Sequence, residues 1–445
     1  MSRNGPPAAA PKRARGKVRV VKSDQKRRGK PEPAQKRGAP PKRRGAHETP
    51  RPRATPDARR DPHARGVADP RLRNAHGERP ERKPEPADPA PRLDSEARLR
   101  SQDPLRVGDW LWTMREGSER DVVEELMLAG KADPRGVGPA LVASRAAPGK
   151  AGDRLELTFA RQGFRVTGIA RAPVLAELAS ELVSELSARL AGAETYALQV
   201  FVPDSTAGNL LSQRAQELLL LLTARLDAAL PGAKRITDPE RSLTSIPLVQ
   251  VCLYAPDQAA AGIVPTDQAL SLAQGGRARM RLSGDFPSRA ARKLEEAFAW
   301  LGVSPGPGEL CVDLGAAPGG WSWLLLERRA RVIAIDPARM DAKLMQNRRL
   351  QHVQGSAFDF APEETVDWLF CDMAWRPLEV AEMLARWARR RYTRLLVANF
   401  KLPMKRKAEM VQRLRSVLEE GGYASIRARQ LYHDRDEITL TARVR

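Results

Sequence analysis

Three glycines follow a short apolar segment in the C-terminal third of the chain, in a pattern typical of a ligand-binding turn. Residues 310–314 read Leu-Cys-Val-Asp-Leu, and residues 315–321 read Gly-Ala-Ala-Pro-Gly-Gly-Trp. The apolar run suits a buried strand of a parallel sheet, and glycine lets the backbone turn tightly and approach a ligand. The segment therefore predicts a strand, a turn and a helix start that hold a nucleoside-bearing cofactor.

The composition of the turn narrows the choice of ligand. It lacks the Lys-Ser/Thr pair of a P-loop, whose lysine reaches the β- and γ-phosphates, and the Gly-x-Gly-x-x-Gly order of dinucleotide sites. A pyrophosphate ligand is therefore disfavoured relative to S-adenosylmethionine (SAM), whose sulfonium and amino-acid tail suit an open, partly acidic loop. A plain strand–turn–helix corner is the alternative that the turn alone leaves open.

Charged residues end three further strand-like segments, residues 331–335, 368–371 and 395–400. Asp336 lies where doubly wound folds place an acid that binds ribose hydroxyls, about 20 residues past the glycine turn. A surface acid at a strand end is the alternative. Asp372 and Lys401 end the other two segments, and the carboxyl ends of parallel strands line one crevice. We therefore expect the three side chains to lie close together.

Two lysines and two acids could act together at this crevice. Lys401 stands between Phe400 and Leu402, a setting able to desolvate its amine and lower its pKa. A lone lysine after a strand is more often solvated. Lys293 lies on an amphipathic helix that leads into the first strand, and Glu437 opens the final strand. These residues form no sequence motif by themselves.

Four sequence segments of the C-terminal third resemble those of the RlmM-type 23S rRNA 2′-O-ribose methyltransferases, which are relatives of the FtsJ/RrmJ group. The segments are residues 312–321, 371–373, 399–405 and 430–437. These segments occur in the same order as in the family. The resemblance implies a Lys-Asp-Lys-Glu tetrad that falls on Lys293, Asp372, Lys401 and Glu437, with Lys401 as the proton acceptor. It also implies SAM-binding positions at Ser288, Ala317, Pro318, Gly319, Gly320, Asp336, Ser356 and Asp372.

The chain departs from the family's pattern at two of these positions. Ala317 stands where the family's turn usually has Cys, a conservative change seen in the FtsJ branch. Ser356 stands where the family has an acid on the adenine side. Loss of that acid leaves the adenine contact open, and Asp359 is the alternative residue for it.

The chemistry of ribose methylation fits a lysine base. A 2′-hydroxyl is a poor nucleophile until a positioned base takes its proton. Burial and the positive Lys293 would lower the pKa of Lys401, while Asp372 and Glu437 would orient the amines and oppose that shift. The five histidines and three cysteines show no ligand spacing, so we expect no metal site.

Positive charge is concentrated at the N-terminus and points to an RNA partner. The net charge of the 445 residues is +22, and residues 1–100 hold 29 Lys and Arg against 12 Asp and Glu. This region has 17 prolines and no Phe, Trp or Tyr, so we expect a disordered tail that neutralises phosphates. A merely solubilising extension is the alternative. No secretory signal or membrane span is expected, and the odd cysteine count suggests a reducing cytoplasm.

The expected architecture is an α/β Rossmann-like SAM-dependent methyltransferase domain over residues 277–445, preceded by two small α+β units. The first, residues 105–175, is expected to be ferredoxin-like, with strands near 154–159 and 163–170. The second, residues 176–272, has strands at 197–202 and 248–254 and a helix at 207–229. It resembles a THUMP-type unit, which implies RNA binding; a neutral packing domain is the alternative.

Two classes of function remain open at this level. The first is a SAM-dependent 2′-O-ribose methyltransferase acting on RNA, with a cytidine of 23S rRNA suggested by the resemblance alone. The second is a non-catalytic RNA-binding or ribosome assembly factor that keeps the fold, and retention of all four tetrad residues argues against it. A base methyltransferase is disfavoured because Met-Ala-Trp follows Asp372, where that chemistry commonly has a Pro-Pro-aromatic loop. Oligomeric state is not indicated.

Overall fold

The computed structural model describes residues 94–445 apart from residues 102, 131, 279, 281–287 and 435. They belong to one compact unit, Pro84–Arg445. Residues 1–93 of the predicted disordered tail lie outside the described residues. Its last residues are folded, because Asp94 accepts a hydrogen bond from the Ala97 amide and caps the short helix α1 (Ser95–Leu99). The folded chain therefore begins before residue 100.

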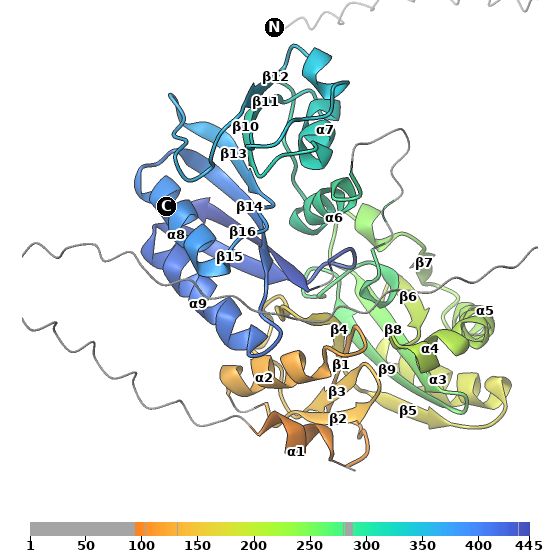
Figure 1. The fold of residues 1–445 in the computed structure, drawn as a ribbon. Coiled ribbons are helices and arrows are strands. Elements are labelled where there is room, and N and C mark those ends of the chain that lie inside the picture. The colour runs from red at the N-terminus through yellow and green to blue at the C-terminus, as the bar shows by residue number, and fades with distance from the viewer. Residues whose placement is uncertain (1–93, 102, 131, 279, 281–287, 435) are drawn as a thin grey trace, which may run out of the picture. The chain divides into compact units, whose positions relative to one another are not determined.

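The C-terminal part is built on a seven-stranded mixed sheet with the order β12-β11-β10-β13-β14-β16-β15 (Figure 1). Strands β10 to β14 run parallel, and β16 is antiparallel to both of its neighbours. This Rossmann-like α/β arrangement confirms the predicted class. The strands are β10 (Leu310–Leu314), β11 (Arg331–Ile335), β12 (Leu350–Val353), β13 (Val366–Cys371), β14 (Thr393–Lys401), β15 (Tyr423–Arg429) and β16 (Glu437–Val444).

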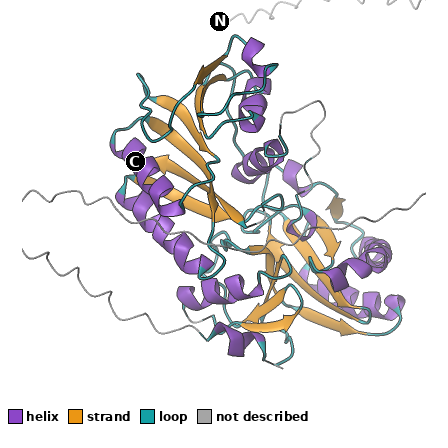
Figure 2. Ribbon diagram, viewed as in Figure 1, coloured by secondary structure: helices purple, strands orange, loops and turns teal. Residues whose placement is uncertain are grey.

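Helices cover both faces of this sheet (Figure 2). Helices α6 (Ala291–Leu301) and α7 (Gly320–Glu327) pack on one face with Cys311 and Phe370. Helices α8 (Pro377–Arg389) and α9 (Lys407–Glu420) pack on the other with Val312 and Leu369. Neighbouring residues of β10 and β13 therefore point to opposite faces, as the pleat requires, and both faces are apolar because both are covered.

The order of strands along the sheet determines where a ligand can bind. The chain runs outward from β10 to β11 and β12, and then returns to β13 on the other side of β10. In doubly wound sheets such a reversal opens a crevice beyond the carboxyl ends of the strands. The glycine turn after β10 and Asp372 after β13 both lie at this reversal.

Residues 110–165 form a four-stranded antiparallel sheet with the order β2-β3-β1-β4. The predicted ferredoxin-like arrangement is not confirmed. It needs a second helix between β3 and β4, where residues 145–159 form turns and extended chain. The elements are β1 (Trp110–Met114), α2 (Glu119–Ala129), β2 (Arg135–Gly138), β3 (Leu141–Ser144) and β4 (Ala160–Arg165).

The strand predicted at residues 154–159 is wrong. The backbone N–H groups of Thr158 and Phe159 donate to the Glu125 carboxylate over 2.7 and 3.2 Å, and that of Leu155 donates to the Gln268 carbonyl over 2.8 Å. These separate partners satisfy the buried backbone without a neighbouring strand. The alternating apolar residues instead reflect packing into the core.

Residues 168–265 form a second, five-stranded sheet with the order β5-β9-β8-β6-β7. Because β5 pairs with β9, this unit begins earlier than the predicted residue 176. The predicted helix at 207–229 is divided at Leu211. The elements are β5 (Gly168–Arg171), α3 (Leu175–Arg189), β6 (Thr195–Phe201), α4 (Thr206–Leu210), α5 (Ser212–Ala229), β7 (Lys234–Ile236), β8 (Pro247–Ala255) and β9 (Gln258–Pro265). Among the described residues, no helix is both long and apolar enough to cross a bilayer.

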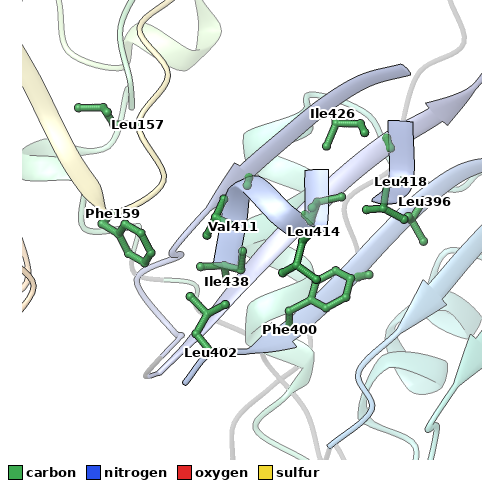
Figure 3. Packing of buried hydrophobic residues seen from close by; sticks show 14 of the residues in the cluster. Leu157, Phe159, Leu396, Phe400, Leu402, Val411, Leu414, Leu418, Ile426 and Ile438 are labelled. Carbon is green, nitrogen blue, oxygen red and sulfur yellow. The ribbon is translucent and has the colours of Figure 1, made fainter. Parts of the chain in front are cut away.

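One hydrophobic core connects the first small sheet to the α9 face of the large sheet. Leu414 of α9 and Phe400 of β14 are fully or almost fully buried in it (Figure 3). Phe159, from the segment before β4, belongs to the same cluster. The core therefore fixes β14, and with it Lys401, against elements from two parts of the chain.

We predict that Leu414→Ala destabilises the protein by about 2–5 kcal/mol, because it removes a fully buried side chain and leaves a cavity. The measurement is urea unfolding followed by far-UV circular dichroism. Leu220→Ala is the matched control, since Leu220 is 70% exposed on α5, and its effect should stay within about 0.5 kcal/mol. Equal effects of the two substitutions would contradict the assignment of this core.

Candidate active site

The glycine turn lies at the carboxyl end of β10. Gly315 and Gly319 have φ values of +77° and +119°, a region that side chains strongly disfavour. A Cβ at Gly315 would lie 2.8 Å from Cγ of Met373, and a Cβ at Gly320 would lie 2.9 Å from Cβ of Ser288. Only glycine therefore allows the loop after β13 and the segment before α6 to approach the turn this closely.

Asp336 holds the turn from the neighbouring strand. Its carboxylate accepts the backbone N–H of Ala317 over 3.0 Å and that of Ala338 over 2.8 Å. Each carboxylate oxygen keeps a further acceptor position, so the predicted ribose contact is compatible with this positioning role. The structure places Asp336 beside the turn, as its spacing in the sequence predicts.

Asp313 is a buried acid beneath the turn that sequence reasoning did not select. Its side chain accepts a hydrogen bond from the Ser322 hydroxyl over 2.7 Å, and its other carboxylate oxygen has no hydrogen-bond partner among the described residues. Burial raises the pKa of Asp313 to about 7, Ser322 opposes the rise, and Asp372 and Asp336 add to it. Three acids therefore lie close enough to influence one another at the crevice.

The four predicted tetrad residues converge on the same edge of the sheet. Lys293 on α6 donates a hydrogen bond to the Glu437 carboxylate at the start of β16. Lys401 and Glu437 are directly opposite each other in the β14–β16 pair, which puts their side chains on one face of the sheet. Asp372 directly follows β13, the parallel neighbour of β14.

The pKa shifts show that these charges act on one another. Burial raises the pKa of Asp372, and Lys293 and Lys401 oppose that rise. Burial by itself would lower the pKa of Lys293, but Asp372 and the hydrogen bond to Glu437 outweigh it and raise the pKa. Lys293 is therefore held as a cation at neutral pH.

Lys401 differs from the sequence prediction in its burial. Its neighbours Phe400 and Leu402 are buried, as expected, but the Lys401 side chain itself is exposed. The predicted desolvation of this amine by the protein alone is therefore wrong. The end of β14 explains the difference, because residues 396–400 are buried on both faces of the sheet, whereas Lys401 is the last residue of the strand.

Two further buried polar residues support the tetrad. Asn399 donates to the Asp372 carboxylate over 3.3 Å and accepts from the Thr439 hydroxyl over 2.7 Å. Asp434 accepts from Thr439 over 3.2 Å and from the Leu431 amide over 3.0 Å, and burial raises its pKa well above the ordinary range. Asp434 also attracts Lys293. The tetrad is thus embedded in a larger polar network.

The remaining predicted cofactor positions lie around the same crevice. Ser288 precedes α6 and faces Gly320. Ser356 and Asp359 are exposed in the loop after β12, where the Ser356 hydroxyl accepts the Phe358 amide over 3.2 Å. Either Ser356 or Asp359 remains available for the predicted adenine contact.

Comparison with known proteins places this site in a family. A family model described as FtsJ-like methyltransferase matches residues 286–404. The ribosomal RNA large subunit methyltransferase M of Halorhodospira halophila is 35% identical over 351 residues, which cover 76% of this chain and 98% of that protein. The chain belongs to the ribosomal RNA large subunit methyltransferase M family. The Methylococcus capsulatus member is 43% identical over 173 residues, covering 37% of this chain and 49% of that protein. The member from Xanthomonas oryzae pv. oryzae PXO99A is 33% identical over 301 residues, covering 64% and 82%.

The protein is therefore a SAM-dependent methyltransferase, and its crevice fits this cofactor. The turn is kept open by glycines whose Cβ atoms would meet neighbouring groups. Two acids border the turn, because Asp336 accepts the Ala317 amide and Asp372 follows the neighbouring strand β13, and their carboxylates suit a sulfonium cation. Asp313 also has a buried oxygen with no partner among the described residues.

Sequence patterns could have identified two of the three buried polar residues that were not predicted. Asp313 is the single charged residue of an otherwise apolar five-residue strand, and an acid in such a strand is rarely left buried without a role. Asn399 likewise interrupts an apolar run. Asp434 gives no such signal, because it lies in a polar segment and becomes buried only through the packing of α6 against that segment.

We predict that the stability of Asp313→Asn relative to the native protein increases with pH. An aspartate whose pKa is raised from 3.8 to about 7 binds a proton more readily when folded, so the native protein loses stability as pH rises through this window. The difference in melting temperature should grow by at least about 2 °C between pH 5 and pH 8, measured by calorimetry. Asp257→Asn, in an exposed turn, controls for loss of one charge. A pH-independent difference would contradict the prediction.

Proposed function

We propose that this enzyme methylates a ribose 2′-oxygen of ribosomal RNA, at a cytidine of 23S rRNA, with Lys401 as the general base. The observation that carries the proposal is the convergence of two lysines and two carboxylates beside the glycine turn. Lys293 lies on α6 and donates to Glu437 of β16, Lys401 is opposite Glu437 in β14, and Asp372 follows β13 beside β14. Such a group suits proton transfer from a hydroxyl.

The two lysines take different roles in this proposal. A lysine accepts a proton only in its neutral form. Lys293 is held as a cation by Asp372 and Glu437, which suits stabilising negative charge on the 2′-oxygen. Lys401 makes no ion pair within 4 Å among the described residues, and its exposed amine can reach a bound ribose. We therefore assign the acceptor role to Lys401.

Positioning supplies most of the remaining catalysis. SAM contributes an electrophilic methyl group on its sulfonium. The protein must place the ribose oxygen in line with that group, a contribution of about 7–11 kcal/mol in favourable cases. Asn399 fixes the Asp372 carboxylate, and Glu437 fixes Lys293, so the groups around the acceptor oxygen are held before the substrate arrives.

The N-terminal parts are proposed to hold the RNA. In this proposal the second small unit, which includes residues 176–272, is THUMP-type and binds RNA. The first, within residues 105–175, packs it against the catalytic part. The basic tail adds phosphate contacts, because most of the excess positive charge lies there. A cytoplasmic location is part of the same proposal.

We predict that Lys401→Ala still binds SAM but loses about 10²- to 10⁴-fold in the rate of methyl transfer, the usual contribution of a positioned base. Lys401→Arg should be nearly as slow, because guanidinium stays protonated. The measurement is single-turnover transfer of labelled methyl to an unmodified 23S rRNA transcript between pH 6 and pH 10.

The matched control for this experiment is Lys405→Ala. Lys405 is an exposed lysine of the loop that follows Lys401, and at saturating RNA its removal should leave the single-turnover rate nearly unchanged. An arginine variant with the native rate would show that Lys401 only anchors the substrate. Mapping the product to a base instead of a ribose would reject 2′-O transfer itself.

We also predict that deleting residues 1–93, which leaves α1 in place, flattens the salt dependence of RNA binding. Neutralising phosphates releases counterions, so the slope of log affinity against log salt should fall by roughly 0.7–0.9 for each phosphate that the tail neutralises. Turnover at saturating RNA should be retained. Filter binding between 50 and 300 mM KCl measures the slope, and an unchanged slope would exclude the tail from RNA binding.

A further inference from the structure

A large aromatic side chain is exposed next to the tetrad. Trp375 is 53% exposed, whereas tryptophan is highly buried on average. It lies three residues after Asp372, and three residues span at most about 11 Å. The indole ring is therefore within reach of a substrate whose ribose lies at Asp372.

The ring is held in this exposed position by specific contacts. Its Nε1–H donates to the Glu379 carboxylate over 2.7 Å, and Arg376 donates to the same carboxylate over 2.8 Å. These two hydrogen bonds lower the pKa of Glu379, so the acceptor stays ionised. The indole also packs on Phe358, with ring centroids 5.7 Å apart and an interplanar angle of 59°. A fixed ring costs little conformational entropy when a ligand stacks on it.

A second exposed apolar residue follows the neighbouring strand. Met404 is 95% exposed and lies three residues after Lys401. Strands β13 and β14 are parallel neighbours, with Cys371 opposite Ala398, so the loops that carry Trp375 and Met404 leave the sheet at the same edge. The two residues therefore lie in adjacent loops, each three residues after a member of the tetrad.

We propose that Trp375, supported by Met404, is a stacking platform for an unpaired RNA base at or next to the methylated nucleotide. RNA reading of this kind uses single-stranded bases that stack on aromatic side chains. The ring is clamped, faces solvent beside the acceptor site, and carries the cationic Arg376 next to it, which suits an adjacent phosphate. Trp375 would thereby position the ribose and contribute to the choice of nucleotide.

The same ring could instead contact the adenine of SAM, because Phe358 belongs to the loop that carries Ser356. We favour the RNA base for two reasons. Phe358 already packs against the indole, and Trp375 still stays 53% exposed while the loop after the neighbouring strand β14 carries Met404, which is 95% exposed. The inference rests on the proposed function in one respect, which is that the acceptor ribose binds at the tetrad.

The test compares Trp375→Ala, Trp375→Phe and Val303→Ala, the last removing a side chain that is 47% exposed in the segment between α6 and β10. Steady-state kinetics with an unmodified 23S rRNA transcript give KM and kcat, and calorimetry gives the affinity for SAM. We expect Trp375→Ala to raise the KM for RNA about 10- to 100-fold. The kcat should change much less, and the affinity for SAM should stay the same. Trp375→Phe should recover most of the loss because it keeps a stacking ring, and Val303→Ala should match the native enzyme.

Two outcomes would overturn the inference. An unchanged KM for RNA in Trp375→Ala would remove the platform, and a weakened SAM affinity with a native KM for RNA would assign the ring to the cofactor. Failure of the proposed catalytic function gives a different result. An active Lys401→Ala enzyme would reject the base assignment, yet the dependence of RNA KM on residue 375 would persist.

Discussion

The ion pair between Lys293 and Glu437 joins the helix that precedes the first strand of the catalytic domain to its last strand. Through the register of β14 and β16 it also fixes the position of Lys401 opposite Glu437. A part-buried ion pair is favourable only when further polar groups compensate for desolvation. Asp372 and Asp434 provide that compensation, and they keep Lys293 positively charged. The site therefore needs all of these elements folded together.

The segment between β15 and β16 extends this constraint to the N-terminal units. The Glu296 carboxylate of α6 accepts the amides of Tyr432 and His433 over 2.7 and 3.1 Å. Arg161 of β4 lies over the Tyr432 ring at 4.9 Å, and the Thr158 carbonyl accepts the Gln430 amide over 2.7 Å. One short segment thus contacts the first small sheet on one side and supports the tetrad on the other. RNA held by the N-terminal parts would meet an acceptor site that is positioned by the same residues.

Sequence patterns predict the catalytic domain better than the parts that precede it. The strands ending at Asp336, Asp372 and Lys401 are recognisable because each is a buried parallel strand followed by a charged residue. The strand prediction at residues 154–159 was wrong because backbone N–H groups of this alternating segment donate to Glu125 and to the Gln268 carbonyl, which no local pattern reveals. Burial of Asp434 and exposure of Lys401 likewise depend on tertiary packing. The residues that form the site could be predicted from the sequence, whereas their solvent exposure could not.

The two sides of the site differ in how far the protein alone completes them. The cofactor side is made of buried or half-buried acids and a glycine turn that lies close to Met373 and Ser288, so it is formed before any ligand arrives. The acceptor side presents Lys401, Trp375 and Met404 to solvent, and in the proposed function the bound RNA covers them. In that proposal, the bound substrate desolvates the Lys401 amine, which is solvated in the free enzyme. Recognition of the RNA and activation of the proposed base then occur in the same step.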